Sequence, residues 1–181
     1  MEIADGIWTV KNFFSEDECA EWIAFAEELG FDEAPISAGI GKEKIQKDVR
    51  NNNRAMLDDE DRAFTLWQQA KKHVPQMIYH RVALGLNERL RFYRYDSSQK
   101  FSWHADGFFR RNNGEQSLLT LMVYLNEDFE GGETVFSGEK TVEVVPETGT
   151  LLFFRHELFH EGSIVRTGRK YVLRTDVMFS P

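Results

Sequence analysis

Residues 117–126, with the sequence SLLTLMVYLN, belong to a series of short apolar stretches whose residues recur with a period near two. Such stretches, bounded by turn residues, are typical of β-strands. The others span residues 86–95, 133–137, 141–145, 150–154, 162–166 and 170–179. Glycine-containing pairs separate neighbours at Gly131-Gly132, Ser137-Gly138 and Thr167-Gly168. The second half of the chain is therefore predicted to form many short antiparallel strands.

The first eighty residues carry helical signals instead. Ser15 and Glu18 form a capping box ahead of an apolar pattern with helical spacing, and Gly30 ends that pattern, which predicts a helix over 15–29. Acidic residues at one end, lysines at the other and then Pro75 predict a second helix over 58–74. Residues 31–56 are polar and predict a loop, with a strand near 48–56.

Two helices followed by many short strands indicate an α+β fold that is mainly β. We expect a double-stranded β-helix, or jelly roll, with N-terminal supporting helices packed on one side. A chain of 181 residues fits a single domain over 1–181, with the supporting helices in about 1–80 and the jelly-roll core in about 86–179.

Composition narrows the range of partners. The net charge of −8 argues against non-specific nucleic-acid binding, which needs a basic surface. No apolar stretch is long enough to span a membrane, and the N-terminus lacks the pattern of a signal peptide. The single cysteine, Cys19, excludes an internal disulfide. We therefore expect a cytoplasmic protein without a membrane partner.

A candidate metal site stands in the strand-rich half. His104 and Asp106 are two residues apart, so in a strand both side chains would point to the same side. A second strand would bring His160 to the same place. Two histidines and one carboxylate are the ligands of the facial triad that holds non-haem Fe(II) with open positions. Lys170, ten residues beyond His160, would supply a cation for an anionic co-substrate such as 2-oxoglutarate.

The surrounding motifs resemble the prolyl-4-hydroxylase-like branch of the Fe(II)/2-oxoglutarate-dependent dioxygenases. The resemblance covers residues 86–179 in order and in spacing. Its motifs are Arg94-Tyr95, His104-Ala105-Asp106, Tyr124-Leu125-Asn126, Gly131-Gly132-Glu133-Thr134, the turn from Pro146 to Gly149, and His160 with Lys170.

The resemblance implies a role for each matching residue. His104, Asp106 and His160 are expected to be the iron ligands. Lys170 is expected to pair with the distal (C5) carboxylate of 2-oxoglutarate. Around it, three further residues are expected near the co-substrate: Tyr124 as the hydrogen-bonding companion of Lys170, Tyr95 beside the co-substrate, and Arg174 near its C1 carboxylate or a substrate anion. Arg169 would face the opposite side of the strand from Lys170 and Arg174.

The reaction implied is hydroxylation with release of succinate and CO2. The metal cofactor would be Fe(II), with 2-oxoglutarate and O2 as co-substrates and ascorbate as a further candidate ligand. Halogenating relatives lack the carboxylate ligand, so Asp106 favours hydroxylation. A prolyl side chain in a peptide or protein is the substrate that the resemblance suggests first, and other side chains and small metabolites stay open.

Two loops bear on the substrate. Where the family has a Gly-Gln pair, this chain has Ser98-Gln99. In members of the family the loop that contains this pair lies near the substrate. The stretch from Gly107 to Gln116 is polar and links two predicted strands beside the metal site, and we expect it to act as a substrate-facing lid.

Three alternatives compete with this reading. His156-Glu157-Leu158-Phe159-His160 matches a zinc metalloprotease motif, but that motif needs a helix, and a strand pattern precedes it here. A nucleic-acid demethylase of the same superfamily would use the aromatic and basic residues at 108–111, against the net acidity of the chain. A non-catalytic jelly-roll binding module would not need the complete set of ligands.

Overall fold

A computed structural model of the protein describes residues 1–37 and 43–181. The helices are α1 (Glu16–Leu29) and α2 (Glu60–Ala70). The strands are β1 (Glu2–Ala4), β2 (Ile7–Val10), β3 (Asp32–Glu33), β4 (Ile36–Ser37), β5 (Glu43–Lys44), β6 (Asn53–Asp58), β7 (Met77–Ile78), β8 (Arg81–Leu86), β9 (Arg89–Tyr95), β10 (Phe101–His104), β11 (Gln116–Tyr124), β12 (Phe129–Gly131), β13 (Thr134–Phe136), β14 (Val142–Val144), β15 (Leu151–Arg155), β16 (His160–Gly162), β17 (Val165–Gly168) and β18 (Lys170–Phe179).

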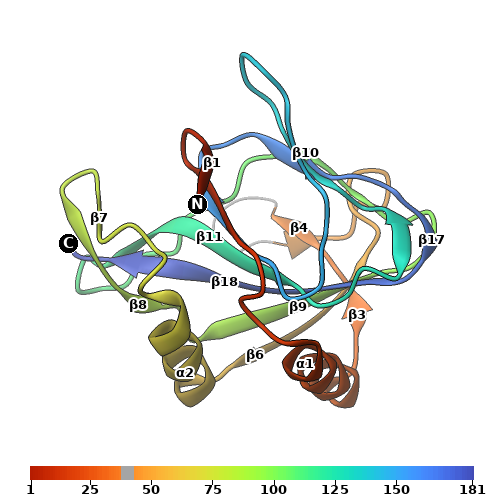
Figure 1. The fold of residues 1–181 in the computed structure, drawn as a ribbon, viewed down its shortest axis with the longest axis horizontal. Helices are drawn as coiled ribbons and strands as arrows, with labels where there is room; N and C mark the ends of the chain where they lie inside the picture. Colours follow the sequence, from red (N-terminus) through yellow and green to blue (C-terminus); the bar gives the residue numbers. More distant parts are fainter. Residues whose placement is uncertain (38–42) are drawn as a thin grey trace.

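Two sheets build the core of the fold. The major sheet has the order β1-β2-β15-β11-β18-β9-β6-β3, with β8 also paired to β18 and β7 to β8. The minor sheet has the order β10-β16-β13-β14. Two small pairs, β12 with β17 and β4 with β5, complete the described strands. Figure 1 shows both helices on the same side of the major sheet, below β9 and β18.

The strands of the major sheet divide their side chains between two apolar clusters. In β11, Leu119, Leu121 and Val123 join the cluster that packs against the helices, whereas Tyr124 joins the cluster between the two sheets. The same alternation sends Leu173 of β18 to the helices and its neighbours to the inside. Because side chains alternate across a strand, each strand serves both clusters at once. The inner face is the one that carries the candidate site.

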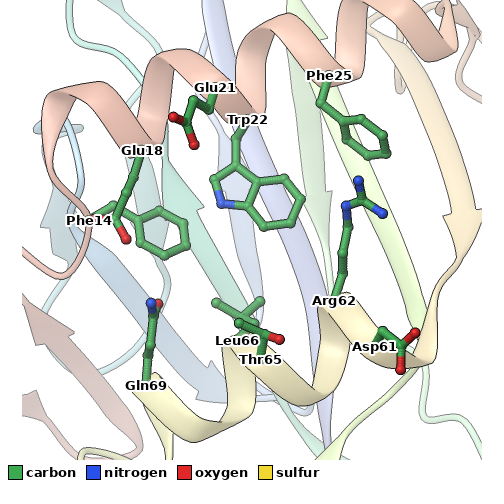
Figure 2. A pocket seen from close by; sticks show the side chains of 10 residues that line it. All are labelled: Phe14, Glu18, Glu21, Trp22, Phe25, Asp61, Arg62, Thr65, Leu66 and Gln69. Atoms are coloured by element: carbon green, nitrogen blue, oxygen red, sulfur yellow. The ribbon is translucent and has the colours of Figure 1, made fainter.

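The helices attach through aromatic residues. The Ser15 hydroxyl accepts the Glu18 N–H and the Glu18 carboxylate accepts the Ser15 N–H, which caps α1. Figure 2 shows a hollow between the helices, where Phe14 and Trp22 of one side face Leu66 of the other and Phe25 faces Arg62. The guanidinium of Arg62 lies 4.2 Å from the centre of the Phe25 ring. Neither of the two described helices has the length and apolar character needed to cross a membrane.

The predicted fold class is confirmed: a mainly β, jelly-roll architecture with helices on one side. The helix predicted over 15–29 is α1 with Ser15 as its cap, and the one predicted over 58–74 is shorter, because α2 ends at Ala70. The predicted strand over 162–166 is wrong in its bounds, since β16 and β17 are separate strands. The strand expected near 48–56 is β6, at Asn53–Asp58. Part of the loop predicted over 31–56, residues 38–42, lies outside the described residues.

The first eighty residues contribute more than helices. β2 pairs with β15 and β6 pairs with β9, so both N-terminal strands extend the major sheet. β6 is the strand expected near 48–56, whereas β2 has only four residues, too few for a periodic signal, and was not predicted. That residues 1–181 form one domain stays a prediction.

Gly149 is expected to be intolerant of a side chain. Its φ is +74°, and a Cβ would lie 2.1 Å from the carbonyl oxygen of Phe14. The Gly149 carbonyl accepts the N–H groups of Phe13 and Phe14, and its own N–H bonds to Tyr124. Gly149→Ala should therefore lower the free energy of unfolding by about 2–4 kcal/mol, measured by urea denaturation.

The matched control is Gly85→Ala in β8. Gly85 has no positive φ, and nothing lies within 4 Å of its Cβ position. That change should leave the free energy of unfolding within about 1 kcal/mol of the original protein. Equal effects of the two substitutions would contradict the role of the left-handed turn at Gly149.

Candidate active site

The two histidines of the candidate site are cross-strand neighbours. His104 ends β10, His160 begins β16, and the two residues are direct partners in the antiparallel register. Opposite residues in an antiparallel pair point to the same face. Their ring centroids consequently lie 4.3 Å apart. Strand pairing alone therefore brings together two residues that are distant in the sequence.

Asp106 reaches the site by a different route from the one predicted. It lies beyond the end of β10 and not within the strand. A hydrogen bond of 3.0 Å from its N–H to the carbonyl oxygen of His156 holds the backbone there. Its carboxylate oxygens lie 3.7 Å from Nε2 of His104 and 3.9 Å from Nε2 of His160. One donor atom from each of the three residues lies within 4.8 Å of the others.

The hydrogen bonds of the histidines fix which nitrogen faces the centre. Nδ1 of His104 lies 2.8 Å from the carbonyl oxygen of Ser102, and Nδ1 of His160 lies 2.9 Å from that of Leu158. A carbonyl oxygen only accepts, so each Nδ1 carries the proton. Each Nε2 is then unprotonated and faces the Asp106 carboxylate. This is the tautomer that a metal ligand requires.

The electrostatics of the site favour the same protonation states. Burial and the neighbouring His160 together lower the pKa of His104 to about 4, although Asp106 opposes both effects. Burial also lowers the pKa of His160. For Asp106, burial alone would raise the pKa, but the charge of Arg174, and at low pH the charges of the two protonated histidines, hold it far below its usual value. At neutral pH the site consequently presents two neutral imidazoles and one carboxylate.

The His156 side chain contacts the Asp106 carboxylate indirectly, through the Thr120 hydroxyl. The Thr120 hydroxyl donates to the Asp106 carboxylate and lies 3.0 Å from Nδ1 of His156. Nε2 of His156 lies 2.9 Å from the Ser117 hydroxyl. Both ring nitrogens are thus engaged, and His156 stands in a turn, not in a helix. The metalloprotease motif lacks the helix that it needs.

Arg174 is close to Asp106. Its Nη2 lies 3.1 Å from the Asp106 carboxylate and 3.3 Å from that of Asp176, while its Nη1 donates to the Tyr93 hydroxyl at 3.2 Å. For Tyr93, burial would raise the pKa, but Arg174 and other nearby guanidinium groups lower it to about 8. Arg174 therefore already has two carboxylate partners. The structure places it beside the candidate ligand, not alone in the cavity.

Lys170 lines the same cavity as the three candidate ligands, which we call the inner cavity. It is 3 % exposed, and its Nζ donates to the carbonyl oxygen of Gly132 at 2.6 Å. The rings of Tyr95 and Tyr124 lie 5.2 and 5.3 Å from Nζ. Within residues 1–37 and 43–181, Lys170 forms no ion pair with a carboxylate. Burial lowers its pKa to about 7, although Glu133 partly opposes this shift.

The two predicted tyrosines differ in their access to this cavity. Tyr95 lines it, whereas Tyr124 is fully buried behind Thr134. The Tyr124 hydroxyl lies 2.6 Å from the Thr134 hydroxyl, and Thr134 forms part of the cavity wall. Thr134 was not among the predicted residues, although the Gly-Gly-Glu-Thr motif that contains it was recognised. Arg169, in contrast, is exposed and bonds to Asp96.

Both loops that were predicted to face the substrate have distinctive backbone features. Ser98 has a φ of 70°, a conformation that glycine adopts at lower cost, in keeping with the glycine of the family motif that it resembles. In the second loop, Arg110 and Gln116 form a bridge, and Gly107, Phe108 and Phe109 line an open cleft outside the three candidate ligands. That this loop moves as a lid stays a prediction.

The residues present fit the groups that the triad suggests. Two imidazole nitrogens and one carboxylate oxygen, half-buried to buried and close together, are the donor set of non-haem Fe(II) sites. A buried ammonium group without a described carboxylate partner, in the wall of the same cavity, suits a dicarboxylate such as 2-oxoglutarate.

The sequence profile of the 2OG-Fe(II) oxygenase superfamily matches residues 90–175. Prolyl 4-hydroxylase 1 of Arabidopsis thaliana is 28% identical over 133 residues, which are 72% of this chain and 46% of that protein. The chain thus spans about half the length of this curated relative.

Two solved structures are similar in fold. A viral collagen prolyl hydroxylase from Paramecium bursaria Chlorella virus 1, solved as a 2-oxoglutarate complex, is 24% identical with a TM-score of 0.67, over 98% of this chain and 99% of that one. A Trichoplax adhaerens prolyl hydroxylase, solved with a peptide fragment of the hypoxia inducible factor oxygen degradation domain, is 15% identical with a TM-score of 0.73, over 96% and 84%.

The sequence match spans all three candidate metal ligands and Lys170. The profile match and the Arabidopsis relative thus support the predicted resemblance to the 2OG-Fe(II) oxygenase superfamily and its prolyl-4-hydroxylase-like branch, and the solved structures share the fold.

Proposed function

We propose that the protein is an Fe(II)- and 2-oxoglutarate-dependent hydroxylase that acts on a peptide or protein side chain, with prolyl as the first candidate, and releases succinate and CO2. The observation that carries the proposal is the pairing of two features in one cavity. His104, Asp106 and His160 line the same cavity as the buried Lys170 ammonium. This is the arrangement that a metal-chelated dicarboxylate would need.

Each part of the site has a proposed role. His104, Asp106 and His160 hold Fe(II), which supplies the oxidative chemistry when it is bound. Lys170 binds the C5 carboxylate of 2-oxoglutarate, and Tyr95 and Thr134 shape the wall on either side. Arg174 and Thr120 hold the Asp106 carboxylate in position. The apolar residues Phe154 and Val172 keep the inner cavity poor in water.

Similar proteins support the proposed substrate class. The Trichoplax relative was solved with a peptide, and the Arabidopsis relative is a prolyl 4-hydroxylase. A peptide also suits the open cleft outside the inner cavity, because that cleft reaches His104 and Asp106. A small metabolite or a nucleic acid remains the alternative substrate. Ascorbate as a ligand and a cytoplasmic location stay predictions.

The test is an assay of succinate release with Fe(II), 2-oxoglutarate and O2, across a panel of proline-containing peptides and small metabolites. We expect slow succinate release without a substrate, faster release with at least one peptide, and a product heavier by one oxygen atom. A protein that binds Fe(II) but gives no succinate under any condition would contradict the proposal. If a small metabolite gains an oxygen atom and no peptide does, the substrate is a metabolite and the proposed peptide substrate is wrong.

A further inference from the structure

The open cleft outside the candidate ligands has an unusual charge. Five arginines line it, against three carboxylates, in a chain whose net charge is −8. The arginines are Arg50, Arg54, Arg89, Arg91 and Arg174, and the carboxylates are Glu43, Asp106 and Asp176. The cleft shares His104, Asp106 and Arg174 with the inner cavity, so the two spaces meet at the candidate metal site.

Four of these five arginines are already compensated by carboxylates of the protein. The pairs are Arg54 with Glu43 at 3.3 Å, Arg89 with Asp58 at 2.7 Å, Arg91 with Asp176 at 3.3 Å, and Arg174 with Asp106 at 3.1 Å. An arginine held in this way offers little charge to a ligand, because its partner competes for the same hydrogen bonds.

Arg50 differs from the other four. It is 5 % exposed, and it has no carboxylate partner among the residues that the structure describes. Its Nε donates to the Asn52 side chain at 2.7 Å and its Nη1 to the Pro35 carbonyl at 3.3 Å, while its Nη2 is buried without a described partner. An uncompensated buried charge is unfavourable in the free protein.

The guanidinium of Arg50 is also held rigidly. Its central carbon lies 4.6 Å from the centre of the Tyr93 ring and 4.3 Å from that of Phe101. Two aromatic faces and two hydrogen bonds therefore fix the group before any ligand arrives. A preorganised guanidinium loses little entropy when it binds an anion.

The position of Arg50 relative to the metal site is set by the backbone. Arg50 and Phe101 form an antiparallel bridge, and Phe101 begins β10, the strand that ends at His104. The Phe101 ring stacks on the His104 ring with centroids 3.6 Å apart. Arg50 is thus separated from a candidate iron ligand by a single aromatic ring.

We propose that Arg50 binds a carboxylate of the substrate, so that the enzyme selects peptides with an acidic side chain close to the hydroxylated residue. The inference rests on the proposed function, since it concerns the substrate of the same site. A single uncompensated guanidinium suits one anionic group. A nucleic acid would instead need a series of free cations along its backbone, and the other cleft arginines are paired.

The experiment uses blocked proline-containing peptides that are identical except for one flanking residue, which is Glu, Gln or Lys at each position in turn. Dissociation constants are measured calorimetrically on the protein loaded with Mn(II) and 2-oxoglutarate under anaerobic conditions. We expect a preference for Glu over Gln of about tenfold or more at one position, as for a charge-assisted hydrogen bond. Arg50→Gln should abolish that preference, and Arg50→Lys should retain part of it.

Arg89→Gln is the matched control, because Arg89 lines the same cleft but is paired with Asp58. It should leave the Glu-to-Gln ratio unchanged. Thermal denaturation of each variant shows whether a lost preference reflects unfolding, and the Arg50→Lys variant carries the test if Arg50→Gln does not fold.

Several results would overturn the inference. One is an equal affinity for Glu and Gln peptides at every position, and another is a preference that survives Arg50→Gln. Absence of binding to every peptide would also overturn it, as would Arg50-dependent binding of an oligonucleotide in place of a peptide. Succinate release is measured separately on the Fe(II) protein, so a protein that forms succinate but ignores peptide charge would refute this inference and leave the proposed function standing.

Discussion

Replacing Asp106 with alanine is expected to abolish stoichiometric Fe(II) binding, and replacing His160 with alanine should do the same. Each change removes one of three donor atoms that lie within 4.8 Å of one another. Loss of a group that only orients a ligand typically costs about 10–100-fold in metal affinity. Loss of a ligand itself should therefore cost more than about 100-fold, measured by anaerobic titration against a competing chelator.

His156→Gln is the control for this pair. His156 lies four residues before His160 but is not part of the cluster of three donors. Its two ring nitrogens lie 2.9–3.0 Å from the hydroxyl groups of Ser117 and Thr120. We expect Fe(II) affinity to fall by less than about tenfold, because His156 acts only through Thr120. Zinc retained in Asp106→Ala and lost in His156→Gln would instead support the metalloprotease reading.

The second large effect is expected at Lys170. Lys170→Met should raise the dissociation constant of 2-oxoglutarate by about 30-fold or more, because the C5 carboxylate would lose its charged partner in a buried site. Fe(II) binding should stay nearly intact, since Lys170 contacts none of the three candidate ligands. Anaerobic titration of the Fe(II) protein, followed through the visible charge-transfer band of the complex, measures both quantities.

Arg169→Ala provides the matched control on the neighbouring residue. The Arg169 side chain is exposed and bonded to Asp96, so its loss should change the 2-oxoglutarate affinity by less than about threefold. Arg174→Ala should act mainly on Fe(II) affinity, because Arg174 holds Asp106. An unchanged 2-oxoglutarate affinity in Lys170→Met, with a large loss in Arg174→Ala, would move the co-substrate anchor to Arg174.

The pH dependence of the same titration follows from the buried ammonium group. Burial lowers the pKa of Lys170 to about 7, so the free protein loses this charge as the pH rises above 7. If only the charged form binds the carboxylate, 2-oxoglutarate affinity should fall by up to about tenfold per pH unit above that value. Lys170→Met should lack this dependence. A slope of equal size in both proteins would assign it to another group.

The stability of the ligand-free protein should show the opposite trend. In the unfolded chain the pKa of a lysine is about 10.4, so between pH 7 and that value the unfolded state binds more protons than the folded one. Stability should therefore rise with pH across this window, and Lys170 should destabilise the folded protein below it. Lys170→Met should accordingly raise the melting temperature at pH 6.

The parts of the fold that were predictable are those with strong local patterns. The capping box at Ser15 and the glycine at position 30 define α1 almost to the residue. The long apolar stretch over 170–179 is β18 without correction. Both α1 and β18 are determined largely by residues that are close together in the sequence, and a sequence pattern records such local relations. The short strands β10 and β16 depend on each other across the minor sheet, and neither is apolar enough to be evident alone.

The candidate site was predicted less completely than its ligands. His104, Asp106 and His160 are brought together, but Asp106 arrives through a turn held by His156 and not by strand alternation. Thr134 lines the cavity where Tyr124 was expected, because the tyrosine is one layer further from the space. No sequence motif indicated Arg50. Its lack of a described carboxylate partner becomes evident only when the ion pairs of the other cleft arginines are known.

β18 carries Lys170, Arg174 and Asp176 on one face, and it pairs with β11 along one edge and with β9 and β8 along the other. A substitution in β18 changes one of these side chains and leaves the others in place. An inserted or deleted residue inside the strand would instead turn every following side chain to the other face of the sheet. We expect relatives of this chain to differ in length in the hairpin between Gly107 and Gln116, and to keep the length of β18 unchanged.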